Sequence, residues 1–195
     1  MYHSIDKAIE AVNQNYATLS PECCTDFSQH SKWVHCKRNT VLVREGQFSD
    51  KTYFIVSGAA RAYYLKDGKE INDWFAFEND FICSINSYFL DIPSPHFIAF
   101  SEPTDLIEIS KTAMLELCEK HRDFERLCLV IVTRTMLRLQ KRVVALQFET
   151  AVQRYENLLA TQPHINKRVG LGHIASYLGI SVETLSRIRN PRKRI

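Results

Sequence analysis

Residues 169–190 read V-G-L-G-H-I-A-S-Y-L-G-I-S-V-E-T-L-S-R-I-R-N, and this stretch decides how the C-terminal part of the chain folds. Ile174 and Leu178 lie on one face at helical spacing, which predicts a short helix with a packed side. Gly179 permits a tight turn after that helix, and Ser181 is a favoured N-cap residue for a second one. Two short helices that cross over a glycine-containing turn form a helix-turn-helix.

The second helix of this pair is expected to present polar side chains outward, because Leu185 and Ile188 occupy its buried stripe. Arg187 can donate two hydrogen bonds to guanine O6 and N7, and Glu183 can accept one from cytosine N4. Basic residues beyond the helix would lie near phosphates and add sequence-independent affinity. The residues expected to contact DNA are Ser181, Val182, Glu183, Thr184, Ser186, Arg187, Arg189, Asn190, Arg192 and Lys193.

Charge is distributed unevenly along the 195 residues. The net charge is +3, yet residues 167–195 hold seven basic residues and one acidic residue, so the rest of the chain is slightly acidic. A basic terminal segment on an acidic body is typical of contact with a polyanion. On charge alone, a solvated basic tail is an equally good interpretation, and the helix-turn-helix pattern decides in favour of DNA.

Between about residue 32 and residue 110, short β-prone runs alternate with turn residues. Asp67-Gly68 lies between two such runs and predicts a hairpin, because these residue types tolerate the positive φ angles of a type I′ turn. Short strands with this punctuation predict a β-sandwich or barrel. The expected strands are 40–43, 52–56, 60–65, 70–75, 97–100 and 105–109.

Helices are expected on both sides of this β region. Apolar residues at three- and four-residue intervals predict a helix over 4–19, and a second short helix runs through Phe27. Ser110 is the expected N-cap of a helix over 112–121. Residues 124–160 then contain neither proline nor glycine, which predicts a helical run that is long for a globular domain.

The segment from Leu127 to Val132 is apolar on nearly every side of this long run. A helix that is apolar all round has to be covered on both faces. The body of the protein can cover one face, and a partner helix is the simplest cover for the other, so we expect a homodimer. The expected interface residues are Phe124, Leu127, Cys128, Ile131, Thr135 and Arg138.

Six cysteines raise the question of disulfides and metal sites. None of them forms the C-x-x-C spacing typical of zinc ribbons and clusters, so no metal site is expected. We expect free buried thiols, with a redox or iron–sulfur role and structural disulfides as the alternatives. The cysteines are Cys23, Cys24, Cys36, Cys83, Cys118 and Cys128.

No apolar run approaches the length of a membrane span, and residues 1–20 lack the pattern of a secretory signal, so a cytoplasmic protein with no membrane partner is expected. The seven histidines are scattered and form no H-x-H pair. A metal oxygenase built on a β-barrel would need two or three histidines and a carboxylate at one metal. We therefore expect no enzyme and no catalytic residues.

The segment I-A-S-Y-L-G-I-S-V-E-T-L-S-R-I-R (174–189), preceded by a β-rich body and a long helix, resembles the catabolite activator/fumarate-nitrate regulator (CRP/FNR) family. Similar stretches are V-L-V-R-E-G-Q (41–47), Y-F-I-V-S-G-A-A-R-A-Y-Y (53–64) and W-F-A-F-E-N-D-F (74–81). The resemblance covers nearly the whole chain.

It implies an α+β fold in three parts. These are a cyclic-nucleotide-binding-type β-roll, or jelly roll, with flanking helices (1–122), a dimerisation helix and linker (123–161), and a helix-turn-helix domain of the winged-helix kind (162–195). The chain stops soon after Pro191, so a short wing is expected.

The function implied by the resemblance is that of a homodimeric, sequence-specific transcription regulator acting on palindromic double-stranded DNA, with RNA polymerase as a further candidate partner. Val182 stands where the catabolite activator branch has an arginine, while Glu183 and Arg187 match, so a different half-site is expected. The alternative is a β-roll sensor that acts through protein contacts, with weak or lost DNA binding.

Family members that bind cyclic nucleotides use Gly-Glu and a later arginine to hold the phosphate. Here Cys83 and Ser84 stand in place of Gly-Glu, residues 92–96 replace the arginine stretch, and no lysine or arginine occurs between Lys69 and Lys111. A buried cyclic phosphate needs a paired positive charge, so we expect no cyclic-nucleotide binding and no cofactor. The aromatic residues of this region are core packing in one interpretation. In the other, they belong to an effector pocket, which is expected around Phe81, Cys83, Ser84 and His96.

Overall fold

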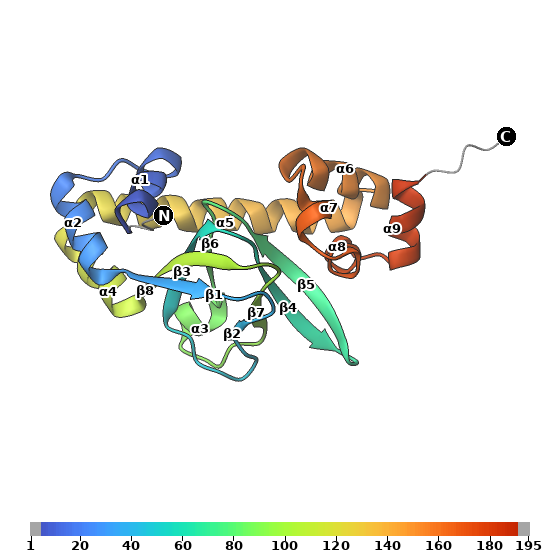
Figure 1. Ribbon diagram of the computed structural model, residues 1–195, viewed down its shortest axis with the longest axis horizontal. Helices are drawn as coiled ribbons and strands as arrows, with labels where there is room; N and C mark the ends of the chain where they lie inside the picture. The colour runs from blue at the N-terminus through green and yellow to red at the C-terminus, as the bar shows by residue number, and fades with distance from the viewer. Residues whose placement is uncertain (1–4, 191–195) are drawn as a thin grey trace.

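The computed structural model describes residues 5–190 as an elongated α+β molecule, with a β-roll in the middle and helices at both ends (Figure 1). The fold class expected from the sequence is confirmed. The helices are α1 (Ile5–Asn15), α2 (Pro21–His30), α3 (Ile85–Leu90), α4 (Lys111–Lys120), α5 (Arg122–Phe148), α6 (Ala151–Thr161), α7 (Ile165–Arg168), α8 (Leu171–Leu178) and α9 (Val182–Arg189).

The β-roll consists of two four-stranded antiparallel sheets, in the orders β1-β8-β3-β6 and β2-β7-β4-β5. Six of the strands agree with the expected ones within a residue or two at each end, whereas β1, β6 and the short helix α3 were not expected. The strands are β1 (Lys32–Cys36), β2 (Val41–Val43), β3 (Lys51–Ser57), β4 (Ala60–Lys66), β5 (Lys69–Ala76), β6 (Phe81–Cys83), β7 (Phe97–Phe100) and β8 (Thr104–Ser110).

The hairpin between β4 and β5 has the geometry that its sequence predicts. Lys66 pairs with Lys69 across the turn, and Asp67 and Gly68 have φ angles of 52° and 73°. Both central residues therefore adopt the left-handed conformation that a type I′ turn requires. The expected N-cap is also confirmed, because the Ser110 hydroxyl accepts a hydrogen bond from the backbone N–H of Ala113.

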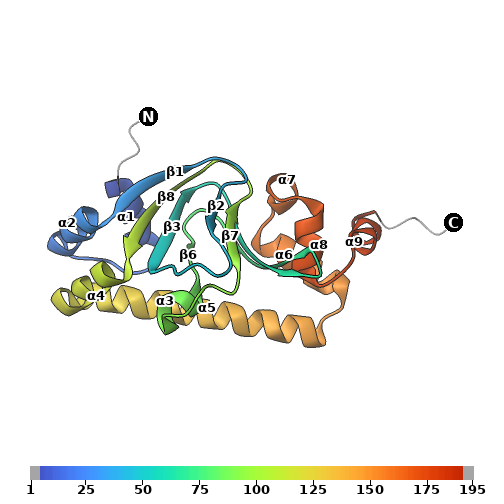
Figure 2. The same cartoon turned by 90° about the horizontal axis from the view of Figure 1, so that it is seen from below.

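Helix α5 spans most of the molecule and connects its two ends. Figure 2 shows it running along one side of the β-roll, from α1, α2 and α4 to the C-terminal helices. At its N-terminal end the rings of Phe27 and Phe124 meet edge to face, 5.1 Å apart. This contact belongs to a core that joins α1, α2, α4 and the start of α5 to the sheet containing β3 and β8.

Two of the residues expected at a dimer interface are instead buried within their own chain. Phe124 and Leu127 are each 1% exposed in this core, so they have no free surface for a partner. Arg138 also faces inward, where its guanidinium donates to the carbonyl of Phe75 and lies over the ring of Trp74. The apolar run that indicated a dimer therefore contains the inward face of α5 as well as its outward face.

The helical run after Phe124 is interrupted although it contains neither proline nor glycine. Helix α5 ends at Phe148, and Thr150 begins α6 with a capping box in which its hydroxyl and the Gln153 side chain satisfy each other's backbone N–H groups. Helix α6 then shares a hydrophobic cluster with α7, α8 and α9. The division at residue 162 stays a prediction, but residues 151–161 pack with the C-terminal helices.

The turn between β3 and β4 provides a test of the packing around the roll. Gly58 has a φ of +100°, and a Cβ there would lie 2.6 Å from the carbonyl oxygen of Pro103 and closer still to Thr104 Oγ1. Gly68 also has a positive φ, but a Cβ there would meet nothing within 4 Å. We expect Gly58→Ala to lower the free energy of unfolding by more than about 3 kcal/mol, because backbone strain and a steric clash combine.

The matched control Gly68→Ala carries the conformational strain alone and should cost about 1 kcal/mol. Denaturant unfolding followed by circular dichroism measures both values. Equal losses for the two variants would contradict the close approach of the β3–β4 turn to Thr104.

Candidate DNA-binding interface

The helix-turn-helix expected from the sequence is present as α8, a turn and α9. Gly179 ends α8 with a φ of 68°, and its N–H donates to the carbonyls of Ala175 and Ser176. Ser181 then caps α9, because its hydroxyl accepts a hydrogen bond of 3.2 Å from the N–H of Thr184. Leu185 is completely buried against α8, and this burial fixes which face of α9 points outward.

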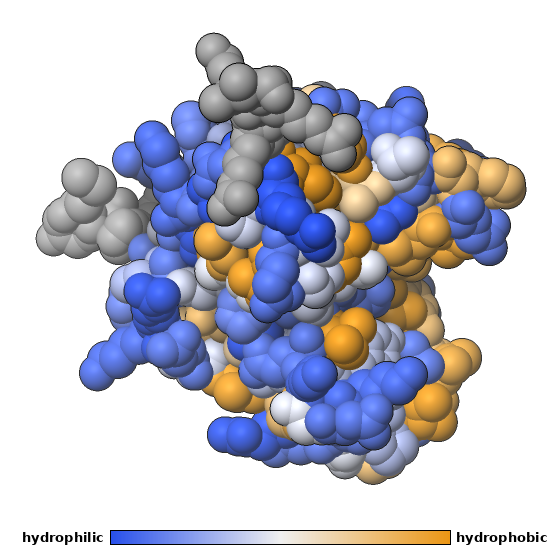
Figure 3. All heavy atoms as spheres, turned by 90° about the vertical axis from the view of Figure 1, so that its right-hand side faces the viewer, coloured by the Kyte–Doolittle hydropathy of each residue, from blue (hydrophilic) through white to orange (hydrophobic). Residues whose placement is uncertain are grey.

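The outward face of α9 carries most of the residues expected to contact DNA. Val182 is 44% exposed, and Thr184 is half-buried with its hydroxyl against Ser181 and Arg187. Arg192 and Lys193 lie outside the described residues. The other expected contact residues are all exposed: Ser181, Glu183, Ser186, Arg187, Arg189 and Asn190. Figure 3 views the molecule from the end that carries α9, and hydrophilic residues predominate on this face.

Glu183 and Arg187 lie one helical turn apart on this face. Hydrogen bonds from its own backbone N–H and from Ser181, together with the charge of Arg187, hold the pKa of the Glu183 carboxyl below its usual range. The Glu183 carboxyl is therefore ionised at neutral pH. The two side chains present an acceptor and a bidentate donor side by side, which is the combination that reads a cytosine and a guanine in the major groove.

Sequence reasoning missed the residues that fix the helix-turn-helix onto the β-roll. The guanidinium of Arg168 bonds both carboxylate oxygens of Glu78 at 2.7 and 2.8 Å, the carboxylate of Glu102 and the carbonyl of Gly58. It also lies over the ring of Phe77, 4.9 Å from the centroid. These partners are 66 to 110 positions away in the sequence, so no local pattern could reveal them.

A second contact joins α8 directly to strand β5. The hydroxyl of Ser176 accepts from the N–H of Asn72 at 2.7 Å and donates to the carbonyl of Glu70 at 2.9 Å. The rings of Phe75 and Tyr177 pack 5.0 Å apart, and Arg142 from α5 lies over Tyr177 and donates to its carbonyl. The position of α8, and with it that of the adjoining α9, is therefore coupled to both the β-roll and α5.

The residues expected around an effector do not form one site. Ser84 is completely buried and donates to the hydroxyl of Ser94, which in turn donates to the carbonyl of His96. The imidazole of His96 is 5% exposed and neither ring nitrogen has a partner. Burial lowers the pKa of His96, so the ring is neutral at pH 7 and supplies no charge for a phosphate.

Phe81 and Cys83 instead line an apolar cavity of about 620 Å³ between α3, α4 and α5, and neither Ser84 nor His96 reaches it. The expectation of a single pocket with all four residues is therefore wrong. Lys111 is the cation that lines this cavity within the described residues, and its ammonium group is paired with Asp91 at 2.8 and 3.0 Å. The remaining lining is largely aliphatic and aromatic.

The six cysteines carry no disulfide within residues 5–190. Cys118 and Cys128 lie on the wall of the apolar cavity with their sulfur atoms 3.5 Å apart. In the same part of the chain, no helix combines the length and the apolar character needed to cross a membrane.

Comparison with known proteins agrees with this geometry. Residues 33–121 match the family model of the cyclic nucleotide-binding domain. No curated protein sequence matches the chain. Among solved structures, FixK2 from Bradyrhizobium japonicum is similar with a TM-score of 0.71 and 17% identity, over 83% of each chain.

Two further structures show the same arrangement. CLP, a c-di-GMP responsive global regulator from Xanthomonas campestris, has a TM-score of 0.67 and 17% identity over 88% of this chain and 91% of its own. The catabolite activator protein of Thermus thermophilus has a TM-score of 0.58 and 16% identity over 93% and 85%.

The chain therefore has the cyclic nucleotide-binding domain fold in its central part. Taken over its whole length, with α5 and the C-terminal helix-turn-helix, its fold is similar to those of FixK2, CLP and the catabolite activator protein. The resemblance seen in the sequence is confirmed at this level.

The Arg168 contacts lead to a stability prediction. Burial alone would raise the pKa of Glu78, but the hydrogen bonds from Arg168 hold it below the usual value. A carboxyl group with a lowered pKa contributes stability above its ordinary pKa of about 4.3, and this contribution is lost as the pH falls through the folded-state value. We expect Arg168→Gln to cost about 2 kcal/mol of unfolding free energy at pH 7, because the groups are partly exposed.

The same loss should shrink as the pH falls through the lowered folded-state pKa of Glu78, because the carboxyl is then protonated in the parent protein as well. Arg126→Gln, at an exposed position on α5, is the matched control and should have little effect. Urea titrations at several pH values measure both variants. A difference between parent and Arg168→Gln that stays constant over the acid range would contradict the assignment.

Proposed function

We propose that this protein is a homodimeric, sequence-specific transcription regulator that reads a two-fold symmetric DNA site with one α9 helix from each protomer. The observation that carries this proposal is the outward face of α9, on which Glu183 in the first turn and Arg187 in the last turn stand exposed one helical turn apart. Recognition helices contact base edges with their N-terminal residues, and a dimer places two of them one helical turn apart.

The outward face of α5 supports the dimer. Leu129, Val132, Met136, Leu139, Val143 and Leu146 recur at alternating intervals of three and four residues. We call these six residues the α5 seam. All except Leu139, which is partly buried against the β-roll core, are among the exposed large apolar residues, with Leu129 exposed at 66%. Val132, Met136 and Leu139 also line the apolar cavity, so the seam and the cavity adjoin. An a/d repeat of this kind is the pattern of a coiled coil, in which each side chain packs into a hole on the partner helix.

The proposed regulator does not respond to cyclic nucleotides. In the region where a cyclic phosphate would be held, the buried side chains are Ser84, Ser94 and a neutral His96, and none of them offers a positive charge. The apolar cavity beside α3 fits a different kind of effector, one with a hydrophobic surface and without a phosphate. RNA polymerase as a further partner and a cytoplasmic location stay predictions.

The role of Arg187 is tested by DNA binding. We expect Arg187→Ala to weaken binding to a site selected from random duplexes by about 1–3 kcal/mol and to relax the preference at one base position of each half-site. The loss has this size because a bidentate contact to guanine disappears. Fluorescence anisotropy at fixed salt measures the affinity, and repeated selection measures the preference.

Arg44→Ala removes the same charge from an exposed position on the β-roll and is the matched control. It should leave the base preference unchanged. If Arg187→Ala selects the same consensus with the same affinity as the parent protein, α9 does not read DNA through this residue.

The α5 seam is tested by placing a charge within it. Met136→Glu buries a carboxylate between two helices without a partner, so we expect the dimer dissociation constant to rise by at least about 100-fold. Leu137→Glu adds the same charge at the neighbouring exposed position, which lies outside the seam, and should leave the dimer intact. Sedimentation velocity over a concentration series measures both. Equal effects of the two substitutions would contradict an interface along the seam.

A further inference from the structure

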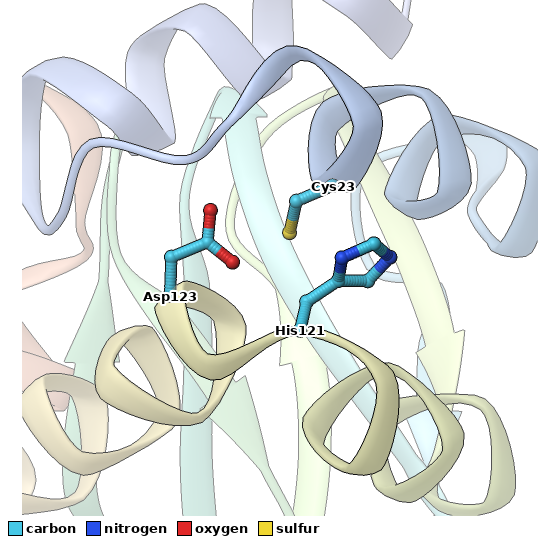
Figure 4. A group of neighbouring side chains, drawn as sticks. All are labelled: Cys23, His121 and Asp123. Carbon is cyan, nitrogen blue, oxygen red and sulfur yellow. The ribbon is translucent and has the colours of Figure 1, made fainter.

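Three side chains with different metal-ligating atoms meet at the end of the molecule opposite α9. A ligand atom from each of Cys23, His121 and Asp123 lies within 4.8 Å of the other two. Figure 4 shows the three side chains pointing toward one another. Cys23 comes from the first turn of α2, whereas His121 and Asp123 lie on either side of the first residue of α5. Their convergence is therefore a product of the tertiary fold.

The orientation of the His121 ring is fixed by a carboxylate on the side of the ring that faces away from Cys23. Its Nε2 lies 2.7 Å from Oδ2 of Asp26, and the same carboxylate is bonded to the ammonium group of Lys120. A proton on Nε2 leaves the lone pair on the other ring nitrogen, which faces the side of Cys23 in Figure 4. Histidines that bind a metal usually donate their other ring N–H to a carboxylate or carbonyl oxygen in this way.

The positions of the Cys23 thiol and the Asp123 carboxylate are also fixed by the fold. Cys23 is fully buried, and Asp123 accepts hydrogen bonds from the backbone N–H groups of Ser20 and Phe124 at 2.6 and 3.0 Å. Burial, reinforced by the charge of Asp123, raises the pKa of Cys23 to about 12, and the thiol is hydrogen-bonded to Asp123. A divalent cation would displace this proton to solvent and bind the thiolate.

We propose that Cys23, His121 and Asp123 bind one divalent transition-metal ion of the Zn²⁺ class. Mixed sulfur, nitrogen and oxygen donors suit this class of ion, and three protein ligands leave a fourth position for water or an exogenous donor. In a tetrahedral zinc site the ligand atoms are roughly 3.3–3.7 Å apart, so the cluster has to close by no more than about 1 Å. An iron–sulfur cluster does not fit, because the site supplies a single thiolate.

This proposal departs from the expectation that the chain has no metal site. That expectation was based on the absence of C-x-x-C spacing, which detects only ligands close together in the sequence. A bound ion would tie α2 to the junction of α4 and α5. It would therefore fix the beginning of the helix that carries the α5 seam and that contacts the helix-turn-helix at its other end.

The full-length protein, stripped of metal with a chelator, is titrated with Co²⁺ and then with Zn²⁺. We expect one Co²⁺ per chain, a near-ultraviolet thiolate-to-cobalt charge-transfer band, and loss of that band when Zn²⁺ displaces the cobalt. Cys23→Ser should abolish the band, and Asp123→Asn should weaken binding by at least about tenfold. Asp26→Asn, which loosens His121 without removing a ligand, should weaken it by about 10–100-fold.

Cys24→Ser is the matched control, because Cys24 is the neighbouring thiol but bonds to Asn13 and Leu19 instead. It should keep the band and the stoichiometry. Circular dichroism of each metal-free variant establishes whether it is folded. If Cys23→Ser does not fold, the loss of metal affinity in Asp123→Asn and Asp26→Asn tests the site instead. Absence of a stoichiometric site, or a cobalt band that survives in Cys23→Ser, would overturn the proposal.

Discussion

Helix α5 is apolar on two faces, and only one of them is buried within the chain. The inward face, with Phe124 and Leu127, completes the core shared by the N-terminal helices and the β-roll. The outward face carries the α5 seam at coiled-coil spacing and stays exposed. Apolar area is costly to leave in water, at roughly 25 cal/mol per Å², and the proposed pairing of two chains along α5 would bury it. In the proposed dimer, the symmetric placement of two α9 helices depends on that pairing.

The C-terminal helices α7, α8 and α9 are connected to the rest of the molecule by contacts that a small shift of α5 or of the β-roll would change. Arg168 bonds carboxylates on two separate loops of the roll, and Ser176 and Tyr177 of α8 contact β5. The apolar cavity lies beside α3, α4 and the middle of α5. An effector that enters it would press on the same helix that pairs the protomers and that supports Tyr177 through Arg142. In the proposed regulator, ligand binding and DNA reading would therefore both act on α5.

Local patterns were sufficient for the parts of the fold that depend on short-range geometry. Asp67-Gly68 predicted the hairpin and Ser181 predicted the cap of α9, because both depend on backbone conformations that their own side chains favour. The interruption at Thr150 was overlooked although T-x-x-Q is a capping box, since a run without proline or glycine was taken as continuous.

Long-range contacts could not be predicted in the same way. The contacts of Arg168 and the meeting of Cys23 with His121 arise only when segments about 70 to 110 positions apart are folded together. For the α5 seam the spacing was visible in the sequence. The segment around Leu127 drew attention instead, because its residues are apolar on both faces and periodicity alone does not tell which face the β-roll covers.

The central claim is that two chains, paired along α5, read one symmetric DNA site. The most direct measurement is the mass of the complex between the full-length protein and a duplex selected from random sequence, determined by sedimentation equilibrium. The account predicts two chains on one duplex whose selected sequence is an inverted repeat, with half-sites about one helical turn apart. One chain per duplex, or a selected sequence without two-fold symmetry, would contradict it.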